Sequence, residues 1–456
     1  MSKSLFSEFN EVSAKQWKQK IQFDLQGANY NDALVWKSNQ GIDVKPFYHA
    51  DDFKTCPEPS NTEASKWKIS QSIYVADVEK SNLNAIDAIE RGAENINFII
   101  PSENFALESL LKNIDIKHVS LNIQPLFLSE TFVEKILDYS EKAQITVNTD
   151  IIGNLAKTGN FFKNLNDDFI QFNPIIKSTK TINVNLSLYQ NAGATMVQQI
   201  AYGLAHTNEY LNHFENQNKS VLQDLKMIFN VSVGTNYFFE IAKLRALRKL
   251  WRTLAAEYQA PLNCYIYTTP TKRNKTLYDY NTNMLRTTTE CMSAILGGSN
   301  IICNLPYDVI YHKTNAFAER IARNQLLILK HESYFNAVDN PSDGSYYIEK
   351  LTEQLAEKAL SLFKDIENQG GFLKQLKNGT IQRKIKESAL KEQEQFNKKE
   401  KVLVGTNSFI NPDDRMKKEL ELFPFVKVNP RKTLIEPIIE KRLAEPLEQK
   451  RLKNEN

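Results

Sequence analysis

Polar side chains near the ends of short apolar runs are the groups of this sequence that could take part in a reaction. They are carboxylates, amides, hydroxyls and one thiol, namely Asp77, Glu103, Gln124, Asp150, Tyr189, Gln190, Asn236, Tyr267, Thr268, Asn300, Cys303 and Asp308. Catalysis by proton transfer, Schiff-base formation or a metal usually needs a tunable base, a lysine or a cluster of ligands. No histidine, lysine or arginine stands at these positions, and we favour helix caps and loop turns for the acids. The residues therefore predict no assembled acid–base site.

The cysteines and histidines form no compact metal-binding motif. The cysteines include no CxxC pair and are Cys56, Cys264, Cys291 and Cys303. The six histidines lack ligand spacing. His206 and His213 lie seven residues apart on one helical face, which favours a surface pair over metal ligands. We therefore predict no metal site.

Three arginines on one helix and two neighbouring glycines could bind phosphate. The helix is predicted over 238–258 and carries Arg245, Arg248 and Arg252, for which salt bridges with neighbouring elements are the favoured interpretation. Gly297-Gly298 follows a predicted helix, where glycine normally ends the helix. A phosphate site is the less favoured alternative at both places.

Eight short apolar runs alternate with amphipathic stretches. These elements must position the polar side chains that lie near the ends of the runs. The runs span 69–76, 96–101, 118–123, 145–149, 181–188, 227–233, 263–268 and 300–304. Strands that alternate with helices pair in parallel, and eight such units in about 250 residues favour a closed barrel over an open doubly wound sheet. The predicted fold is α/β, a (β/α)8 TIM barrel.

Serines and one glycine mark predicted helix boundaries. Ser81, Ser102 and Ser129 precede helical patterns, and a serine hydroxyl can accept a hydrogen bond from a first-turn amide. Gly92 follows the first of these patterns and predicts a helix stop.

Segments of different composition flank the predicted barrel. Residues 1–66 are rich in Asn, Asp, Lys and Pro but contain many aromatics, which predicts an extended arm that lies on a larger surface and wraps a partner subunit. The barrel is predicted over 67–406. Residues 407–456 contain five prolines and predict an extended, linker-like tail.

Bulk properties exclude several classes of protein. Lys plus Arg number 57 against 54 for Asp plus Glu, a net charge of +3, so a nucleic-acid or membrane-surface partner is not expected. The N-terminus lacks an apolar signal core, and no run approaches the length of a membrane span. We expect a cytoplasmic protein.

A series of collinear motifs carries a family resemblance. They are NAGAT at 191–195, QIAYGLA at 199–205, NYFFEIAKLRALR at 236–248, NMLRTTTE at 283–290, ERIARNQ at 319–325, GSYYIEKLT at 344–352 and GTN at 405–407. These resemble motifs of the methylmalonyl-CoA mutase family, and within it the small subunit. The resemblance implies a TIM barrel that binds an acyl-CoA, joined to a cobalamin-binding domain. It also implies the radical interconversion of methylmalonyl-CoA and succinyl-CoA with adenosylcobalamin.

The chain departs from the family pattern where the family's pocket residues lie. Ser70 and Ser72 replace an arginine and a tyrosine, and Tyr267 and Cys303 replace histidines. The remaining pocket positions are Leu188, Gln190, Asn191, Asn300 and Leu305. Leu188 replaces a histidine and Asn191 a glutamate of one family motif, while Gln190 keeps the glutamine of that motif. The resemblance therefore implies a degenerate substrate pocket with no catalytic residue.

The cobalt-ligating motif of the family, D-x-H-x-x-G, is absent, and the tail at 442–451 is similar to the segment that leads toward the family's cobalamin domain. We therefore expect a small subunit without its own cobalamin domain, itself non-catalytic, that forms a heterodimer with a cobalamin-binding large subunit. Two alternatives stay open. One is an active barrel that uses a cobalamin domain on another chain, and the other is a homo-oligomeric acyl-CoA-binding scaffold.

Overall fold

An eight-stranded parallel sheet forms the centre of the protein. The computed structural model describes residues 8–55, 57–60, 62–140, 144–427 and 430–455, so Cys56 lies outside the described residues. The strands are β3 (Lys68–Tyr74), β4 (Asn95–Ile100), β5 (Ser120–Pro125), β6 (Ile145–Val147), β7 (Thr181–Asn185), β8 (Lys226–Val233), β9 (Cys264–Pro270) and β10 (Ile301–Cys303). Each coincides with one predicted apolar run. The α/β class and the TIM-barrel architecture are confirmed.

The sheet curls into a nearly closed barrel. Its strand order is β6-β5-β4-β3-β10-β9-β8-β7, and every neighbouring pair is parallel. Strands β6 and β7 therefore stand at the two ends of the order, and no backbone ladder joins them within the described part of the chain. We call this place the β6–β7 seam.

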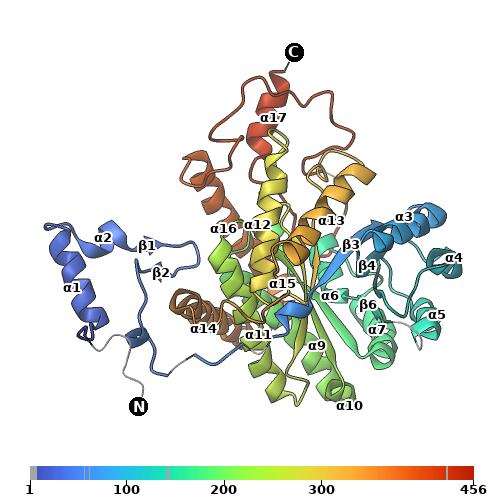
Figure 1. Cartoon of the computed structure of the whole chain (residues 1–456). Helices are drawn as coiled ribbons and strands as arrows, with labels where there is room; N and C mark the ends of the chain where they lie inside the picture. Colours follow the sequence, from blue (N-terminus) through green and yellow to red (C-terminus); the bar gives the residue numbers. More distant parts are fainter. Residues whose placement is uncertain (1–7, 56, 61, 141–143, 428–429, 456) are drawn as a thin grey trace.

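Helices surround the barrel (Figure 1). They are α3 (Val78–Glu90), α4 (Leu107–Leu111), α5 (Glu130–Ser140), α6 (Ile151–Thr158), α7 (Leu165–Thr179), α8 (Ser187–Ala192), α9 (Met196–Gln217), α10 (Ser220–Gln223), α11 (Tyr237–Glu257), α12 (Thr282–Leu296), α13 (Ala316–His331), α14 (Tyr346–Asn368), α15 (Phe372–Lys377) and α16 (Thr380–Asn397). Among the described residues, no helix combines the length and the apolar character needed to cross a membrane.

Two of the three predicted serine caps are wrong. Ser129 does cap α5, because its hydroxyl accepts from the amide of Phe132 at 3.2 Å. Helix α3 begins earlier than predicted, with Asp77 as its cap, so that Ser81 lies inside the helix. Helix α4 begins at Leu107, five residues after Ser102, and has no side-chain cap. The predicted stop at Gly92 is confirmed, since this glycine follows α3 with a φ of +97°.

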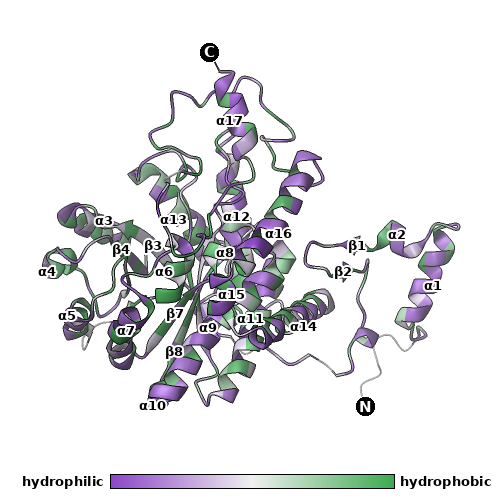
Figure 2. Cartoon of the chain, turned by 180° about the vertical axis from the view of Figure 1, so that it is seen from behind, coloured by the Kyte–Doolittle hydropathy of each residue, from purple (hydrophilic) through white to green (hydrophobic). Residues whose placement is uncertain are grey.

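The N-terminal segment holds its first two helices away from the barrel in both views (Figures 1 and 2). It contains α1 (Ala14–Asp24), α2 (Tyr30–Leu34) and an antiparallel hairpin of β1 (Trp36–Lys37) and β2 (Asp43–Val44), followed by the 3-10 turns η1 (Ala50–Asp52) and η2 (Ala64–Lys66). Aromatic contacts join it to the barrel helices, including Trp36 with Phe239 at 5.7 Å and Tyr48 with Tyr347 at 5.5 Å between ring centroids.

The C-terminal segment runs along the barrel before its last helix, α17 (Glu445–Lys453). Ile435 and Ile438 are buried, and the backbone amide of Ile438 donates to the carbonyl of Ala156 at 2.8 Å. Near α17, the guanidinium of Arg442 donates to the carbonyl of Lys275 at 2.9 Å and forms an ion pair with Glu448 at 2.7 Å. The domain boundaries at 66/67 and 406/407 stay predictions.

Candidate functional site

Polar side chains line the axis of the barrel. The strand register pairs Ser70 with Asn95 and Ser72 with Asn97, and the next strand continues each row with Ser120 and Asn122. Because side chains alternate along a strand, the residues between them face the helices; on β4 these are apolar, Ile96 and Phe98, whereas on β3 the residue between the serines is Gln71. Barrel interiors are usually filled by bulky branched residues. This barrel instead has a polar axis.

Three of the predicted pocket residues meet on this axis and form what we call the Ser70 cluster: Ser70, Tyr267 and Cys303. The hydroxyl of Ser70 donates to Asn95 Oδ1 at 2.7 Å and lies 3.1 Å from the hydroxyl of Tyr267. Cys303 pairs with Ser70 in the strand register. Burial raises the pKa of Tyr267 well above its ordinary value and also raises the pKa of the Cys303 thiol. Both groups are therefore neutral near pH 7.

The next layer of the axis contains buried amides with unused hydrogen-bonding atoms. Asn97 donates to the hydroxyl of Ser72 at 3.0 Å, and Asn230 donates to Asn183 Oδ1 at 3.2 Å. Asn148 Oδ1, Asn183 Nδ2 and Asn230 Oδ1 have no partner among the described residues. Asn148 directly follows β6 and Asn183 belongs to β7, so these amides lie near the β6–β7 seam.

The pocket positions on α8 are held by elements outside the barrel axis. Leu188, Gln190 and Asn191 are all buried. Gln190 donates to Glu240 at 3.2 Å and accepts from Lys243 at 2.8 Å. The side-chain oxygen of Asn191 accepts from the hydroxyl of Thr271 at 2.7 Å and from the amide of Lys272 at 3.1 Å. These side chains attach α8 to α11 and to the loop after β9.

Asn300 does not share the axis with the other predicted positions. It precedes β10, at the opposite end of that strand from Cys303, so the prediction that it stands at a carboxyl end is wrong. Its side-chain oxygen accepts from Arg248 at 2.6 Å and from the amide of Ile266 at 2.9 Å. Leu305 lies beyond the end of β10, partly buried, and its amide donates to Asn304 at 2.9 Å.

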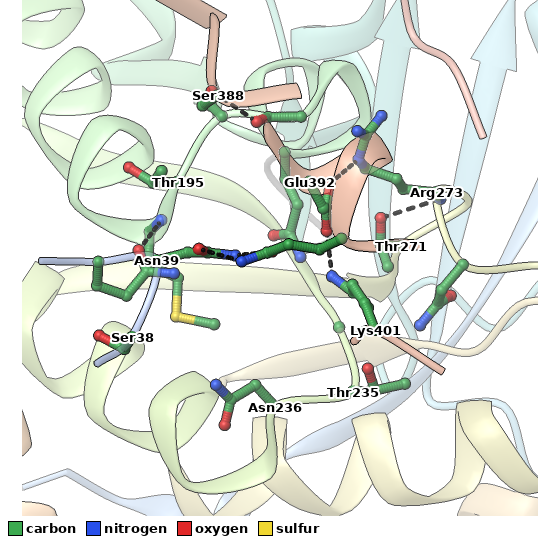
Figure 3. Close-up of a pocket in the computed structure, with 18 of the residues that line it drawn as sticks. Ser38, Asn39, Thr195, Thr235, Asn236, Thr271, Arg273, Ser388, Glu392 and Lys401 are labelled. Atoms are coloured by element: carbon green, nitrogen blue, oxygen red, sulfur yellow. Dashed lines mark hydrogen bonds and ion pairs between the residues drawn. The ribbon is translucent and has the colours of Figure 1, made fainter. Parts of the chain in front are cut away.

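A polar cavity of about 480 Å³ lies beside the barrel between the β1–β2 hairpin, α8, α9, α16 and the loops after β8 and β9. Figure 3 shows Glu392 between Arg273 and Lys401, with an ion pair to Arg273 at 2.5 Å. Although burial opposes the shift, the two cations lower the pKa of Glu392. The charges of Glu392, Arg273 and Lys401 are thus neutralised within the wall. The residues that line this cavity come from six segments that are distant in the sequence, so no local sequence pattern indicates it.

A buried network around His206 was missed by the sequence analysis. His206 is fully buried, and its ring lies 3.0 Å from Asp150 Oδ1 and 3.0 Å from the hydroxyl of Tyr189. Asp150 also accepts from Tyr210 at 2.7 Å and, across the β6–β7 seam, from the amide of Asn185 at 3.2 Å. Burial disfavours the charged form, yet the imidazole of His206 and the hydrogen bonds lower the pKa of Asp150.

The predicted surface pair of histidines is therefore wrong. His213 lies near His206 on α9 but stacks on Phe169 with ring centroids 4.1 Å apart, and burial lowers its pKa. The heptad spacing placed both rings on one face of α9. That face is covered by Phe372 of α15 and Phe169 of α7 rather than facing solvent, which the spacing alone could not show.

A comparison with protein families decides the ancestry of the chain. A family model described as methylmalonyl-CoA mutase matches residues 106–445, about three quarters of the sequence. The chain belongs to the methylmalonyl-CoA mutase family. The predicted family membership is confirmed.

Named relatives within the mutase family include small subunits. The methylmalonyl-CoA mutase small subunit of Porphyromonas gingivalis is 33% identical over 443 residues, covering 89% of this chain and 71% of the relative. The small subunit of Streptomyces virginiae is 26% identical, covering 89% and 72%. The methylmalonyl-CoA mutase of Rhizobium meliloti is 27% identical, covering 88% of this chain and 64% of that protein.

Proposed function

We propose that this chain is the small subunit of a heteromeric, adenosylcobalamin-dependent methylmalonyl-CoA mutase, and that it stabilises the large subunit without catalysing. The reaction of the complex is the interconversion of methylmalonyl-CoA and succinyl-CoA. Its similarity to two small subunits supports this assignment. We also place the protein in the cytoplasm, a reducing compartment, because the described cysteines Cys264, Cys291 and Cys303 are free thiols.

The Ser70 cluster is the observation that carries the non-catalytic role. Cys303 is the last residue of β10, whereas Ser70 lies in the first half of β3 and Tyr267 at the middle of β9. The cluster therefore lies on the axis below the carboxyl ends at which a barrel enzyme holds its reacting groups. Its hydroxyls and thiol are bonded to one another or to Asn95, and burial keeps Tyr267 and Cys303 neutral. A general acid works best with a pKa near the operating pH, which neither group has. The cluster supports the loss of acid–base function.

The histidines of the chain give no support for a cobalt site in this subunit. The buried His206 has both ring nitrogens engaged, by Asp150 and by Tyr189. His213 bonds to Asn173, and His331 lies exposed at the end of α13. Within the described ranges, no group of three or more His, Cys, Asp or Glu side chains could hold a metal. We therefore assign the cobalamin to the partner subunit.

The N-terminal arm supplies the surface that we assign to the partner. None of the residues of α1 is buried, although a helix of this length normally buries one face. Trp17 is 50% exposed and Phe23 78% exposed, and Phe9 and Trp36 are exposed as well. Exposed aromatics on a projecting segment are typical of a protein–protein interface. Docking of this arm on the large subunit would bury them.

Mixing experiments test the assignment. The chain would be combined with a cobalamin-binding large subunit, and the mass would be followed by light scattering. We expect a complex that contains one copy of each chain and a higher unfolding temperature of the large subunit in that complex. A double variant, Trp17→Ser with Phe23→Ser, should weaken the complex. A matched control, Leu83→Ser with Ile170→Ser, also changes two exposed apolar residues but on α3 and α7, and should not. A chain that never associates contradicts the proposal, and turnover with an isolated cobalamin domain alone supports an active barrel instead.

The polar axis favours a second candidate function, an acyl-CoA-binding barrel without catalysis. The unpartnered atoms of Asn148, Asn183 and Asn230 need polar partners, which water or a polar chain on the axis would supply. Calorimetric titration with succinyl-CoA tests this candidate. Binding that is weakened by Asn183→Leu supports it, and the absence of heat at millimolar ligand contradicts it.

A further inference from the structure

A cationic cavity lies between the N-terminal segment, α11 and α14, outside the barrel axis. Its volume is about 440 Å³, within the range of about 300–1,000 Å³ that ligand pockets span. Residues 57–60 form one wall, and Figure 1 shows the connection from the arm to β3 passing α14 and α11. We propose that this cavity binds a phosphate-bearing small molecule.

Four cations of α11 line the cavity from one helical face. They are Arg245, Arg248, Lys249 and Arg252, and the spacing of three and four residues places them on adjacent turns. The opposite face of α11 packs into the core through residues such as Leu247 and Leu250, both buried, and this packing fixes the helix. The cationic row is thus fixed in orientation, facing the cavity.

Only one of these cations is neutralised by carboxylates. Arg245 forms ion pairs with Glu349 at 2.6 Å and with Asp343 at 3.2 Å, so the predicted salt bridge is confirmed for this residue. Arg248 donates to three uncharged oxygens, namely the carbonyls of Cys264 and Gly298 and the side chain of Asn300, at 2.5–2.6 Å.

Lys249 and Arg252 have no ion-pair or hydrogen-bond partner among the described residues, which leaves three cations without a carboxylate. The acidic side chains of the wall do not remove this excess. Glu353 is paired with Lys350 at 2.6 Å, and Glu58 is exposed.

Two buried donors add a second, independent indication of a ligand. Arg245 is 7% exposed, yet its Nε has no hydrogen-bond partner, and the Nε of Arg248 also has none. Buried donors are almost always satisfied in folded proteins. Phosphate oxygens are the acceptors that a guanidinium fork matches best, and they carry the charge that Lys249 and Arg252 would neutralise. A phosphoryl group fits both observations.

Calorimetric titration of the full chain with inorganic phosphate, pyrophosphate and adenosine diphosphate tests the proposal. We expect the binding of at least one probe, weakened about tenfold or more by Lys249→Gln with Arg252→Gln and weakened further by added salt. Both side chains are exposed, so this double variant should fold normally. The control is Lys374→Gln with Lys377→Gln, which removes two exposed lysines at the same spacing from α15 and should leave the affinity unchanged.

The three probes also separate the possible sources of the phosphoryl group. Tighter binding of the nucleotide than of pyrophosphate indicates a nucleotide ligand, and equal binding indicates phosphate recognition alone. The proposal is overturned if none of the three binds at millimolar concentration, or if the control pair loses as much affinity as the test pair. A change of the unfolding temperature with pyrophosphate, absent in the test pair, provides a second readout on the same samples.

Discussion

Replacement of Asp150 by asparagine is the sharpest test of how this barrel is held together at its seam. The carboxylate accepts four hydrogen bonds, from Gly153 and Tyr210 at 2.7 Å, from His206 at 3.0 Å and from Asn185 at 3.2 Å. An amide of the same shape keeps an acceptor on one side. On the other side it presents a donor to the amide of Asn185, so that the contact across the β6–β7 seam is lost.

The magnitude follows from these contacts. A hydrogen bond to a charged group contributes about 1.5–3 kcal/mol, which is the expected cost of losing the bond from Asn185. The other three bonds change from charge-assisted to neutral, and neutral bonds are roughly half as strong. Removing one member of a buried pair such as Asp150 and His206 typically costs about 3–5 kcal/mol. We therefore expect Asp150→Asn to lower the free energy of unfolding by about 3–5 kcal/mol.

The pH dependence has a defined sign. The pKa of Asp150 is lower in the folded state, so its contribution to stability is fully present above the unfolded value of about 3.9. That contribution is lost as the pH falls through the folded value. The part of the difference between the wild type and Asp150→Asn that comes from this carboxylate should therefore be fully present near neutrality and shrink in acid.

Urea unfolding followed by circular dichroism measures this difference. The matched control is Asp115→Asn, because Asp115 also pairs with a histidine, His118 at 2.7 Å, but on the surface; its unfolding midpoint should hardly move. A double-mutant cycle with His206→Gln should show strong coupling. A loss below about 1 kcal/mol for Asp150→Asn, or additive effects in the cycle, would refute the reasoning.

Three further predictions follow from the same structure. Tyr267→Phe should leave the turnover of the reconstituted complex nearly unchanged, because the proposed function gives the Ser70 cluster no catalytic part; a large drop in a coupled assay would show a working barrel. Gly405→Ala should lower the unfolding temperature, since Gly405 has a φ of +78° and a Cβ would collide with Asp279; strain in this region alone costs about 1–2 kcal/mol. Glu448→Ala should make the C-terminal segment sensitive to limited proteolysis, because this buried carboxylate accepts from the amide of Leu277 at 2.8 Å and pairs with Arg442; an unchanged digestion rate would count against that role.

The strands could be read from the sequence because their apolar positions are local and periodic. Ile96 and Phe98 alternate with Asn95 and Asn97 along β4, and this alternation is present before any tertiary contact is known. The helix starts were less certain, because several polar residues near a helix can cap it. Asp77 rather than Ser81 caps α3, because Asp77 lies close to the end of β3, where the chain turns into the helix.

The site was only partly accessible to sequence reasoning. Counting along motifs brought Ser70, Tyr267 and Cys303 into one set, and they do meet on the axis. The same counting included Asn300, which lies at the other end of its strand. A motif shows the order of residues along the chain, but it does not show how far along the barrel axis each side chain lies. The contact of Asp150 with His206 joins residues 56 apart, which no local pattern encodes.

The polar axis also affects how the stability of this barrel changes with temperature. Unfolding a protein raises its heat capacity in proportion to the apolar surface that becomes hydrated, while newly hydrated polar surface lowers it. An interior built from rows such as Ser70–Asn95–Ser120 and Ser72–Asn97–Asn122 exposes amide and hydroxyl groups where most barrels expose hydrocarbon. Calorimetry should therefore give a smaller heat-capacity increment per residue, and a flatter stability curve, than for barrels with branched aliphatic interiors. Such a subunit would lose little stability over a broad span of temperatures.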